Sequence, residues 1–200
     1  MCAAVLLAGV IGLWCYLRYV GPLPGDEAIL RRVEAHQALR TSHLLQFFGN
    51  LGTTSVAFVT VVIAAAIVGR TIGLLAACAV LLSAIGVVVN ESLRAILGPT
   101  PTSQATFGAF FESYPSGHVV YATTVFGLLA WLAWRHGRRD AAVVLAGLVV
   151  AMGPARVLNS AHLPSDVIGG YLLGGAWLLL VLTAYAIACA RREGHRVRLR

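Results

Sequence analysis

Charged residues are scarce in this sequence, and lysine is absent from it. Only 12% of the 200 residues are charged and the mean hydropathy is +0.81, whereas about a quarter of the residues in a soluble domain are charged. This deficit excludes an ordinary soluble globular protein and indicates an integral membrane protein. All 15 basic side chains are arginines, which lie in short clusters between apolar runs. The net charge of +7 therefore fits membrane topology and does not indicate binding to nucleic acid.

Signatures of metal sites and disulfides are also missing. The four cysteines lie in or beside apolar runs without C-x-x-C spacing, so we expect inert thiols and no disulfide framework. His36 and His43 have no carboxylate-rich ligand set around them, which favours interfacial side chains over a metal site. We therefore expect no metal ion and no other cofactor. The cysteines are Cys2, Cys15, Cys78 and Cys189.

Long apolar runs dominate what is present. Runs of roughly 20 residues predict membrane-spanning helices, whereas a membrane β-barrel would alternate with period two. We predict an all-α fold, a polytopic bundle of six transmembrane helices that forms a single domain over residues 1–200. The first run could be a signal peptide, but it lacks a basic n-region and a cleavage site, which favours a retained helix. The six runs are 2–20, 54–69, 72–97, 119–134, 141–158 and 166–190.

The polar segments between the runs predict the topology. Residues 21–50 mix charged and apolar residues with the spacing of an amphipathic helix, which we expect to lie at the interface and pack on the bundle. Partner binding is the alternative for this segment. With six spans both termini share one side, and the loops and tail (191–200) on that side hold nine of the 15 arginines. The positive-inside rule then predicts that both termini and the basic tail lie in the cytoplasm. We expect the protein to reside in a bacterial plasma membrane.

The stretch Tyr114-Pro115-Ser116-Gly117-His118 stands just before the fourth run, on the predicted extracytoplasmic side. A proline can begin a helix, and the first backbone N–H groups of a helix are unpaired within it. Such a helix start binds anions. His118 can exchange a proton near neutral pH, so this stretch predicts a phosphate-binding site with an acid or base beside it.

A second polar cluster, 156–166, precedes the sixth run on the same predicted side. Pro164 suits a first helical position, which places His162 just before the helix and Asp166 in its first turn. A carboxylate there can hold the imidazole in one tautomer and leave its other nitrogen free to attack an electrophile. Arg156 is a fork-shaped donor suited to phosphate oxygens.

Residues 94–101, as a first motif, together with these two segments resemble the three-part signature of the type 2 phosphatidic acid phosphatase (PAP2) superfamily, whose membrane members have six helices. The resemblance covers about residues 90–175, which we expect to form the active-site core. The second and third motifs fit closely, but the first departs from the pattern because Leu93 and Thr100 stand where lysine and arginine are usual. We expect Arg94 to replace the lysine; the alternative is that Arg94 snorkels to the interface or pairs with Glu91.

The resemblance implies a role for each polar residue. His162 would attack phosphorus and form a phospho-histidine, and Asp166 would orient it. His118 would protonate the leaving group and then activate water. The residues expected to bind the phosphate are Arg156, Arg94, Ser116 and Gly117, with weaker contributions from Thr100 and Tyr114.

The function that we predict is metal-independent hydrolysis of a lipid phosphate or diphosphate presented from the bilayer. Polyprenyl diphosphate, phosphatidic acid and phosphatidylglycerol phosphate all fit this chemistry. The alternatives are a non-catalytic protein that binds or moves lipid phosphates, and a phosphotransferase that uses an acceptor other than water. The sequence makes no prediction about the oligomeric state.

Overall fold

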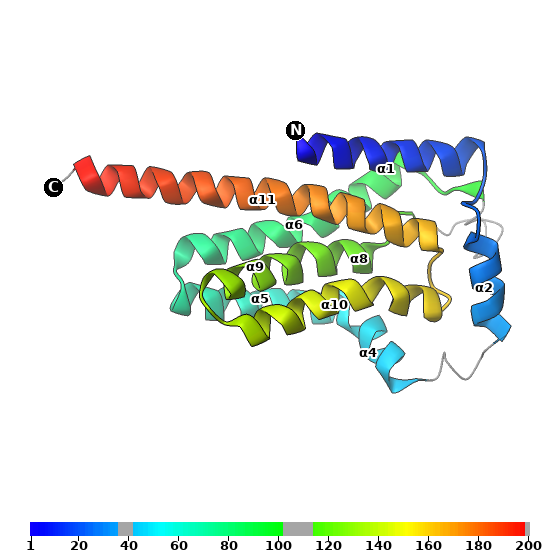
Figure 1. The fold of residues 1–200 in the computed structure, drawn as a ribbon, viewed down its shortest axis with the longest axis horizontal. Helices are drawn as coiled ribbons and strands as arrows, with labels where there is room; N and C mark the ends of the chain where they lie inside the picture. Colours follow the sequence, from blue (N-terminus) through cyan, green and yellow to red (C-terminus); the bar gives the residue numbers. More distant parts are fainter. Residues whose placement is uncertain (36–41, 102–113, 199–200) are drawn as a thin grey trace.

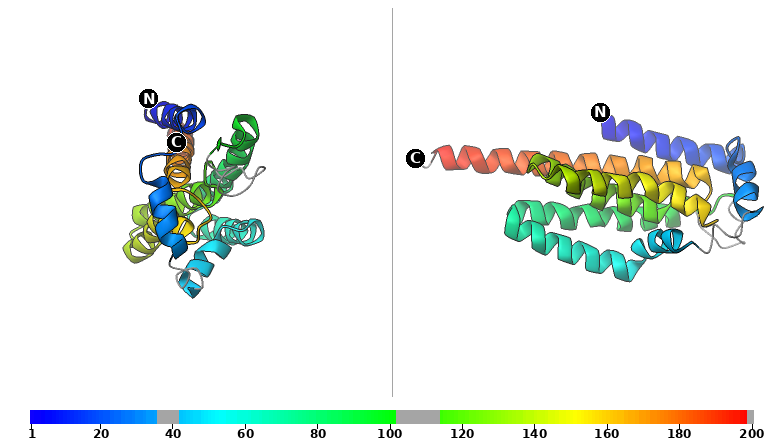
Figure 2. Two further views of the ribbon diagram at one scale, coloured as in Figure 1. Left: turned by 90° about the vertical axis from the view of Figure 1, so that its right-hand side faces the viewer. Right: turned by 60° about the horizontal axis from the view of Figure 1, so that its bottom comes forward.

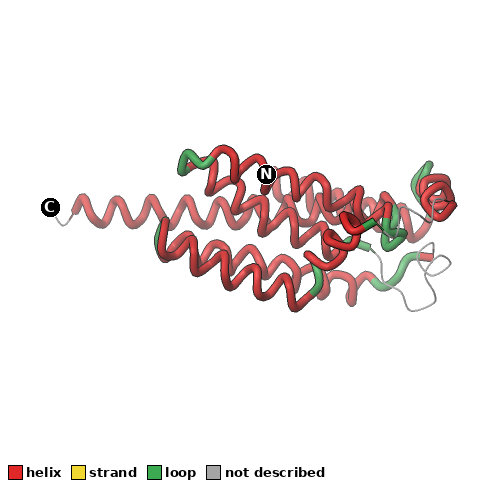
Figure 3. The backbone as a smooth tube through the Cα atoms, turned by 90° about the horizontal axis from the view of Figure 1, so that it is seen from below, coloured by secondary structure: helices red, strands yellow, loops and turns green. Residues whose placement is uncertain are grey.

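The chain forms a bundle of helices. The computed structural model describes residues 1–35, 42–101 and 114–198, with side chains up to Glu193. Every regular element in these ranges is helical (Figures 1 and 3), which confirms the predicted all-α class. Six segments are long and apolar enough to cross a membrane.

These six segments coincide with the six apolar runs of the sequence, which confirms the predicted number and order of spans. The fourth span is one helical segment in three parts, and its middle turn, η1, is π-helical. The spans are α1 (Cys2–Tyr19), α5 (Thr54–Thr71), α6 (Leu74–Leu97), α8, η1 and α9 (Gly117–Tyr121, Ala122–Phe126 and Gly127–Arg135), α10 (Arg139–Leu158) and α11 (Pro164–Arg198).

Among its described residues, the polar segment 21–50, for which the sequence predicts an amphipathic helix, includes two short helices. They are α2 (Asp26–Ala35) and α4 (His43–Leu51), and residues 36–41 between them lie outside the described residues. Ser42 stands at the N-cap of α4 with an extended backbone, ψ 127°, which starts a new helix. Helix α2 contacts α10 and α11, and α4 contacts α5 and α10, so both pack at one end of the bundle (Figure 1).

Helix α11 packs against most of the other spans. It contacts α1, α6 and α8, and the end-on view in Figure 2 shows α1 on its outer side. Small residues allow the close contacts: a Cβ added at Gly170 would lie 2.9 Å from the Ser116 carbonyl oxygen, and one at Gly174 would lie 2.7 Å from Cβ of Thr123. The indole N–H of Trp177 donates to the Leu82 carbonyl at 3.0 Å, which ties α11 to α6.

A proline inside α10 is accommodated by a tyrosine of α11. Pro154 has no N–H, so the carbonyl of Val150 four residues earlier loses its helical donor. The hydroxyl of Tyr171 lies 3.0 Å from that oxygen and 2.9 Å from the Val149 oxygen, and it accepts from the Gly153 N–H at 3.1 Å. The break in α10 is therefore bridged to α11, close to the turn that carries the second polar cluster.

Candidate active site

The two polar motifs predicted from the sequence meet at the start of two helices. Ser116 is the N-cap of α8, and its backbone N–H donates to the carbonyl oxygen of Asp166 at 3.0 Å. Gly170, one turn further along α11, leaves the space that the Ser116 backbone occupies. The motif at 114–118 is thus fixed directly on the first turn of α11.

His162 and Asp166 face each other as the sequence predicts. Helix α11 begins at Pro164, and His162 Nδ1 lies 3.6 Å from Asp166 Oδ2, an ion-pair separation slightly beyond hydrogen-bonding range. The same oxygen accepts from the Leu163 N–H at 2.9 Å, which fixes the carboxylate. Burial lowers the pKa of His162 and outweighs the opposing effect of the Asp166 carboxylate. The imidazole is therefore neutral at pH 7, with a lone pair on one nitrogen.

His118 is held by α4, an element that the sequence analysis did not connect with the site. Its Nε2 lies 3.0 Å from the Gly49 carbonyl oxygen, and because a carbonyl can only accept, Nε2 carries the proton and Nδ1 is the acceptor. A Cβ at Gly52, just after α4, would overlap the His118 ring. Asn159 Nδ2 donates to the Leu45 carbonyl at 2.9 Å and so joins α4 to the turn after α10.

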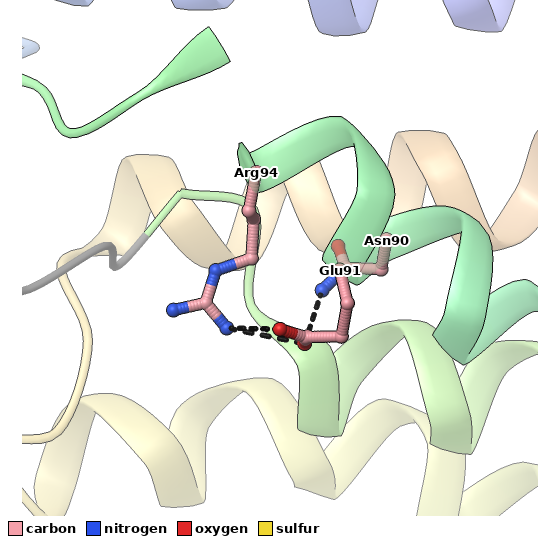
Figure 4. Close-up of polar contacts among 3 residues, drawn as sticks. All are labelled: Asn90, Glu91 and Arg94. Atoms are coloured by element: carbon pink, nitrogen blue, oxygen red, sulfur yellow. Dashed lines mark hydrogen bonds and ion pairs between the residues drawn. The ribbon is translucent and has the colours of Figure 1, made fainter. Parts of the chain in front are cut away.

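Two arginines bring positive charge to the same place. The side chain of Arg156 comes near α4, because a Cβ at Gly49 would lie 3.7 Å from Arg156 Nη1. Arg94 Nη1 lies 3.2 Å from Glu91 Oε1 (Figure 4), and Asn90 Nδ2 donates to the same oxygen at 3.3 Å. The Nε atoms of both arginines are buried and have no partner among the described residues. Arg94 therefore pairs with Glu91 and also lines the pocket described next, and its replacement of the lysine stays a prediction.

These side chains surround one open pocket of about 810 Å³. Its polar end contains both histidines and both arginines, and its apolar part lies along α5 and α6. Within the described residues, no group of three or more His, Cys, Asp or Glu side chains could hold a metal ion. The lining residues are Gly52, Thr53, Thr54, Ala57, Phe58, Val61, Ala84, Val87, Val88, Glu91, Arg94, Gly117, His118, Tyr121, Arg156 and His162.

Four predicted site residues lie behind the pocket wall. Ser116, Asp166, Thr100 and Tyr114 are all almost completely buried and do not line the pocket. Ser116 Oγ has no partner among the described residues. The hydroxyl of Tyr114 donates to the Val10 carbonyl of α1 at 2.7 Å, and burial raises its pKa. Tyr114 thus anchors the motif on α1 and does not line the pocket.

Comparisons with known proteins identify a matching sequence family and similar relatives. The sequence model of the PAP2 superfamily matches residues 89–188. A lipid A 1-phosphatase of Rhizobium etli is 33% identical over 111 residues, 50% of this chain and 46% of the relative. One of Rhizobium johnstonii is 35% identical over 113 residues, 52% of this chain and 43% of the relative. The aligned part spans less than half the length of these two curated relatives.

A solved structure has the same fold. The crystal structure of a transmembrane PAP2-type phosphatidylglycerolphosphate phosphatase from Bacillus subtilis superimposes with a TM-score of 0.71. The superposition covers 90% of this chain and 94% of that one, at 20% sequence identity. At this identity the likeness establishes the fold alone: a six-helix membrane bundle.

Proposed function

Because this chain belongs to the PAP2 superfamily, we propose that it is a membrane phosphatase that hydrolyses a lipid phosphate or diphosphate without a metal ion. The observation that carries this proposal is the composition of one pocket. His118, His162 and Arg156 line its polar end, and the side chains of α5 and α6 continue it as an apolar groove. A phosphate and a hydrocarbon chain on the same molecule fit these two parts.

The apolar groove supports a lipid as the substrate. Phe58 and Val61 of α5 and Val87 and Val88 of α6 line it. Phe58 is 70% exposed and Val88 62% exposed, on helices that can cross the membrane. These exposed faces would contact bilayer lipid, so a hydrocarbon chain can enter from the side without crossing water.

Phosphate recognition relies on arginines and on the start of α8. The N–H groups of Gly117, His118 and Val119 donate to no acceptor among the described residues, as expected for the first turn of a helix. Together with Arg156 and Arg94 they would stabilise the charge on the phosphoryl oxygens. This supplies positive charge for the reaction without a divalent cation.

The reaction that we propose has two steps. The unprotonated nitrogen of His162 attacks phosphorus, and a P–N bond forms as the bond from phosphorus to the leaving oxygen breaks. His118, in its protonated form, gives its proton to the leaving oxygen. His118 then takes a proton from a water molecule that attacks phosphorus, the P–N bond breaks, and phosphate leaves. Asp166 holds His162 in place and stabilises its positive charge.

The orientation that we propose places the pocket on the extracytoplasmic side and both termini in the cytoplasm. The pocket lies at the end of the bundle that carries α2 and α4, whereas the basic residues Arg191 and Arg192 lie near the opposite end of α11. An extracytoplasmic reporter fused at the C-terminus is then inactive and a cytoplasmic one is active.

The direct test is phosphate release from lipids in detergent with EDTA present. We expect purified protein to release inorganic phosphate from phosphatidic acid, phosphatidylglycerol phosphate or a polyprenyl diphosphate, at a rate that EDTA does not change. Candidate alcohols in the same assay reveal a phosphotransferase as a phosphorylated alcohol. Saturable lipid binding without any release would instead indicate a non-catalytic protein, and loss of activity with EDTA would contradict the metal-independent mechanism.

Glu91 offers a test of how the arginines are used. Its carboxylate competes with the substrate phosphate for Arg94. We expect Glu91→Gln to lower the KM for a lipid phosphate roughly two- to fivefold, the size expected of a partly exposed ion pair, with little change in kcat. Glu27→Gln removes an exposed carboxylate outside the pocket and serves as the control. An unchanged or higher KM in Glu91→Gln would mean that Arg94 does not meet the phosphate.

A further inference from the structure

A buried carboxylate on α2 bonds to the helix that carries the site. Asp26 is only 2% exposed. Its Oδ1 accepts from the backbone N–H of Ser165 at 3.1 Å, and its Oδ2 accepts from the N–H of Leu23 at 3.0 Å. Asp26 thus links α2 to the first turn of α11, although the two bonded residues are 139 positions apart in the sequence.

The Ser165 N–H depends on this carboxylate. The first N–H groups of a helix need acceptors from outside its own ladder. Just before α11 the N–H of Leu163 donates to Asp166 Oδ2. Pro164 has no N–H, and the N–H of Asp166 donates to the Leu163 carbonyl. Ser165 is completely buried, so bulk water does not reach its N–H in the intact structure, and Asp26 is its acceptor. Of the backbone donors of this turn, it is the Ser165 N–H that depends on Asp26.

We infer that Asp26 is a positioning residue that fixes the first turn of α11 and so holds His162 and Asp166 in their reacting geometry. The inference rests on the proposed function, in which His162 forms the bond to phosphorus. Ser165 stands between the two residues in sequence, and the 3.6 Å separation of His162 and Asp166 depends on the path of this turn. A displacement of about 1 Å at a reacting group can cost roughly 10²-fold in rate.

Two substitutions and one control separate positioning from general stability. Asp26→Ala removes both acceptors. Asp26→Asn keeps one acceptor oxygen, but its amide nitrogen is a donor, so it can satisfy only one of the two N–H groups. Glu27→Ala is the matched control, because Glu27 is the neighbouring carboxylate, is 57% exposed at its side chain, and pairs only with Arg31 of the same helix among the described residues.

Turnover and anion binding are then measured on folded protein, with the melting temperature recorded for each variant. We expect Asp26→Ala to lower kcat at least roughly tenfold with little change in KM, Asp26→Asn to lie between it and the wild type, and Glu27→Ala to match the wild type. Orthovanadate accepts the nucleophile as a fifth ligand, whereas inorganic phosphate reports only on the arginines and the helix end. Asp26→Ala should therefore weaken vanadate binding and leave phosphate binding unchanged.

The two readouts separate this inference from the proposed function. If the wild type binds vanadate more tightly than phosphate but releases no phosphate from any lipid, the proposed function is contradicted. The effect of Asp26→Ala on vanadate binding would still decide the role of Asp26. Equal loss of vanadate and phosphate binding, or a lower melting temperature with unchanged kcat and vanadate affinity, would overturn the positioning role and leave Asp26 as a fold anchor.

Discussion

Replacement of His162 by alanine should reduce phosphate release roughly 10⁴-fold or more, because it removes the group that we propose bonds to phosphorus. His162 lines the pocket, and its Nδ1 faces the fixed carboxylate of Asp166. The measurement is kcat on a lipid phosphate, with phosphate binding measured separately to show that Arg156 and the helix end still function.

His43→Ala is the control for this substitution. His43 begins α4 and does not line the pocket, so its loss should leave kcat unchanged. A further measurement examines the covalent step: with radiolabelled substrate, denaturation during turnover should trap acid-labile label on the wild type and none on His162→Ala. Retention of more than about 1% of the wild-type rate by His162→Ala would contradict the assignment of the nucleophile.

The sequence predicts the spans and the two helix starts because these depend on local features. Long apolar runs can only be helices in a bilayer, and Pro164 marks the start of α11 through its fixed backbone angle. The sequence predicts that His118 and His162 come together because both stand at the start of a span on the same predicted side and because their segments resemble the PAP2 signature. The bond between Ser116 and Asp166 that joins them could not be predicted from spacing.

The contributions of α2 and α4 could not be predicted, for a physical reason. Asp26 and Glu27 are adjacent acidic residues at the start of one amphipathic helix, and periodicity assigns both to its polar face. In the structure Asp26 is buried against α11 and Glu27 is exposed, a difference set by which surface α2 packs on. Gly49 contributes a backbone carbonyl, a group that every residue has, so no sequence signal identifies it.

The sequence also allows two orientations of the Arg94 side chain. Arginine at the end of a membrane helix can turn to the interface or to the bundle interior. In the structure Arg94 lines the pocket and pairs with Glu91. The departure of the first motif from the family pattern thus leaves a pocket whose second arginine is partly neutralised, which makes Arg156 the main unpaired positive charge described at the site.

Gly52→Ala should lower kcat roughly 10²-fold by displacing His118, although no polar group is lost. The backbone at Gly52 has φ −97°, which any residue adopts, so the substitution causes no backbone strain. The new Cβ would instead overlap the His118 ring. The ring can move only by breaking its 3.0 Å contact with the Gly49 carbonyl, and His118 then no longer meets the leaving oxygen or the attacking water.

A substrate with a good leaving group makes this prediction specific to proton transfer. An aryl phosphate such as nitrophenyl phosphate needs no proton to leave, so Gly52→Ala should release about one equivalent of nitrophenol quickly. Slow turnover should follow, because water attack on the phospho-histidine still needs His118 as a base. Gly147→Ala is the matched control, since a Cβ there meets open space. If Gly52→Ala keeps the wild-type kcat, the contact between Gly52 and His118 is absent from the working enzyme. If the first turnover on the aryl phosphate is slow, the substitution disturbs His162 as well.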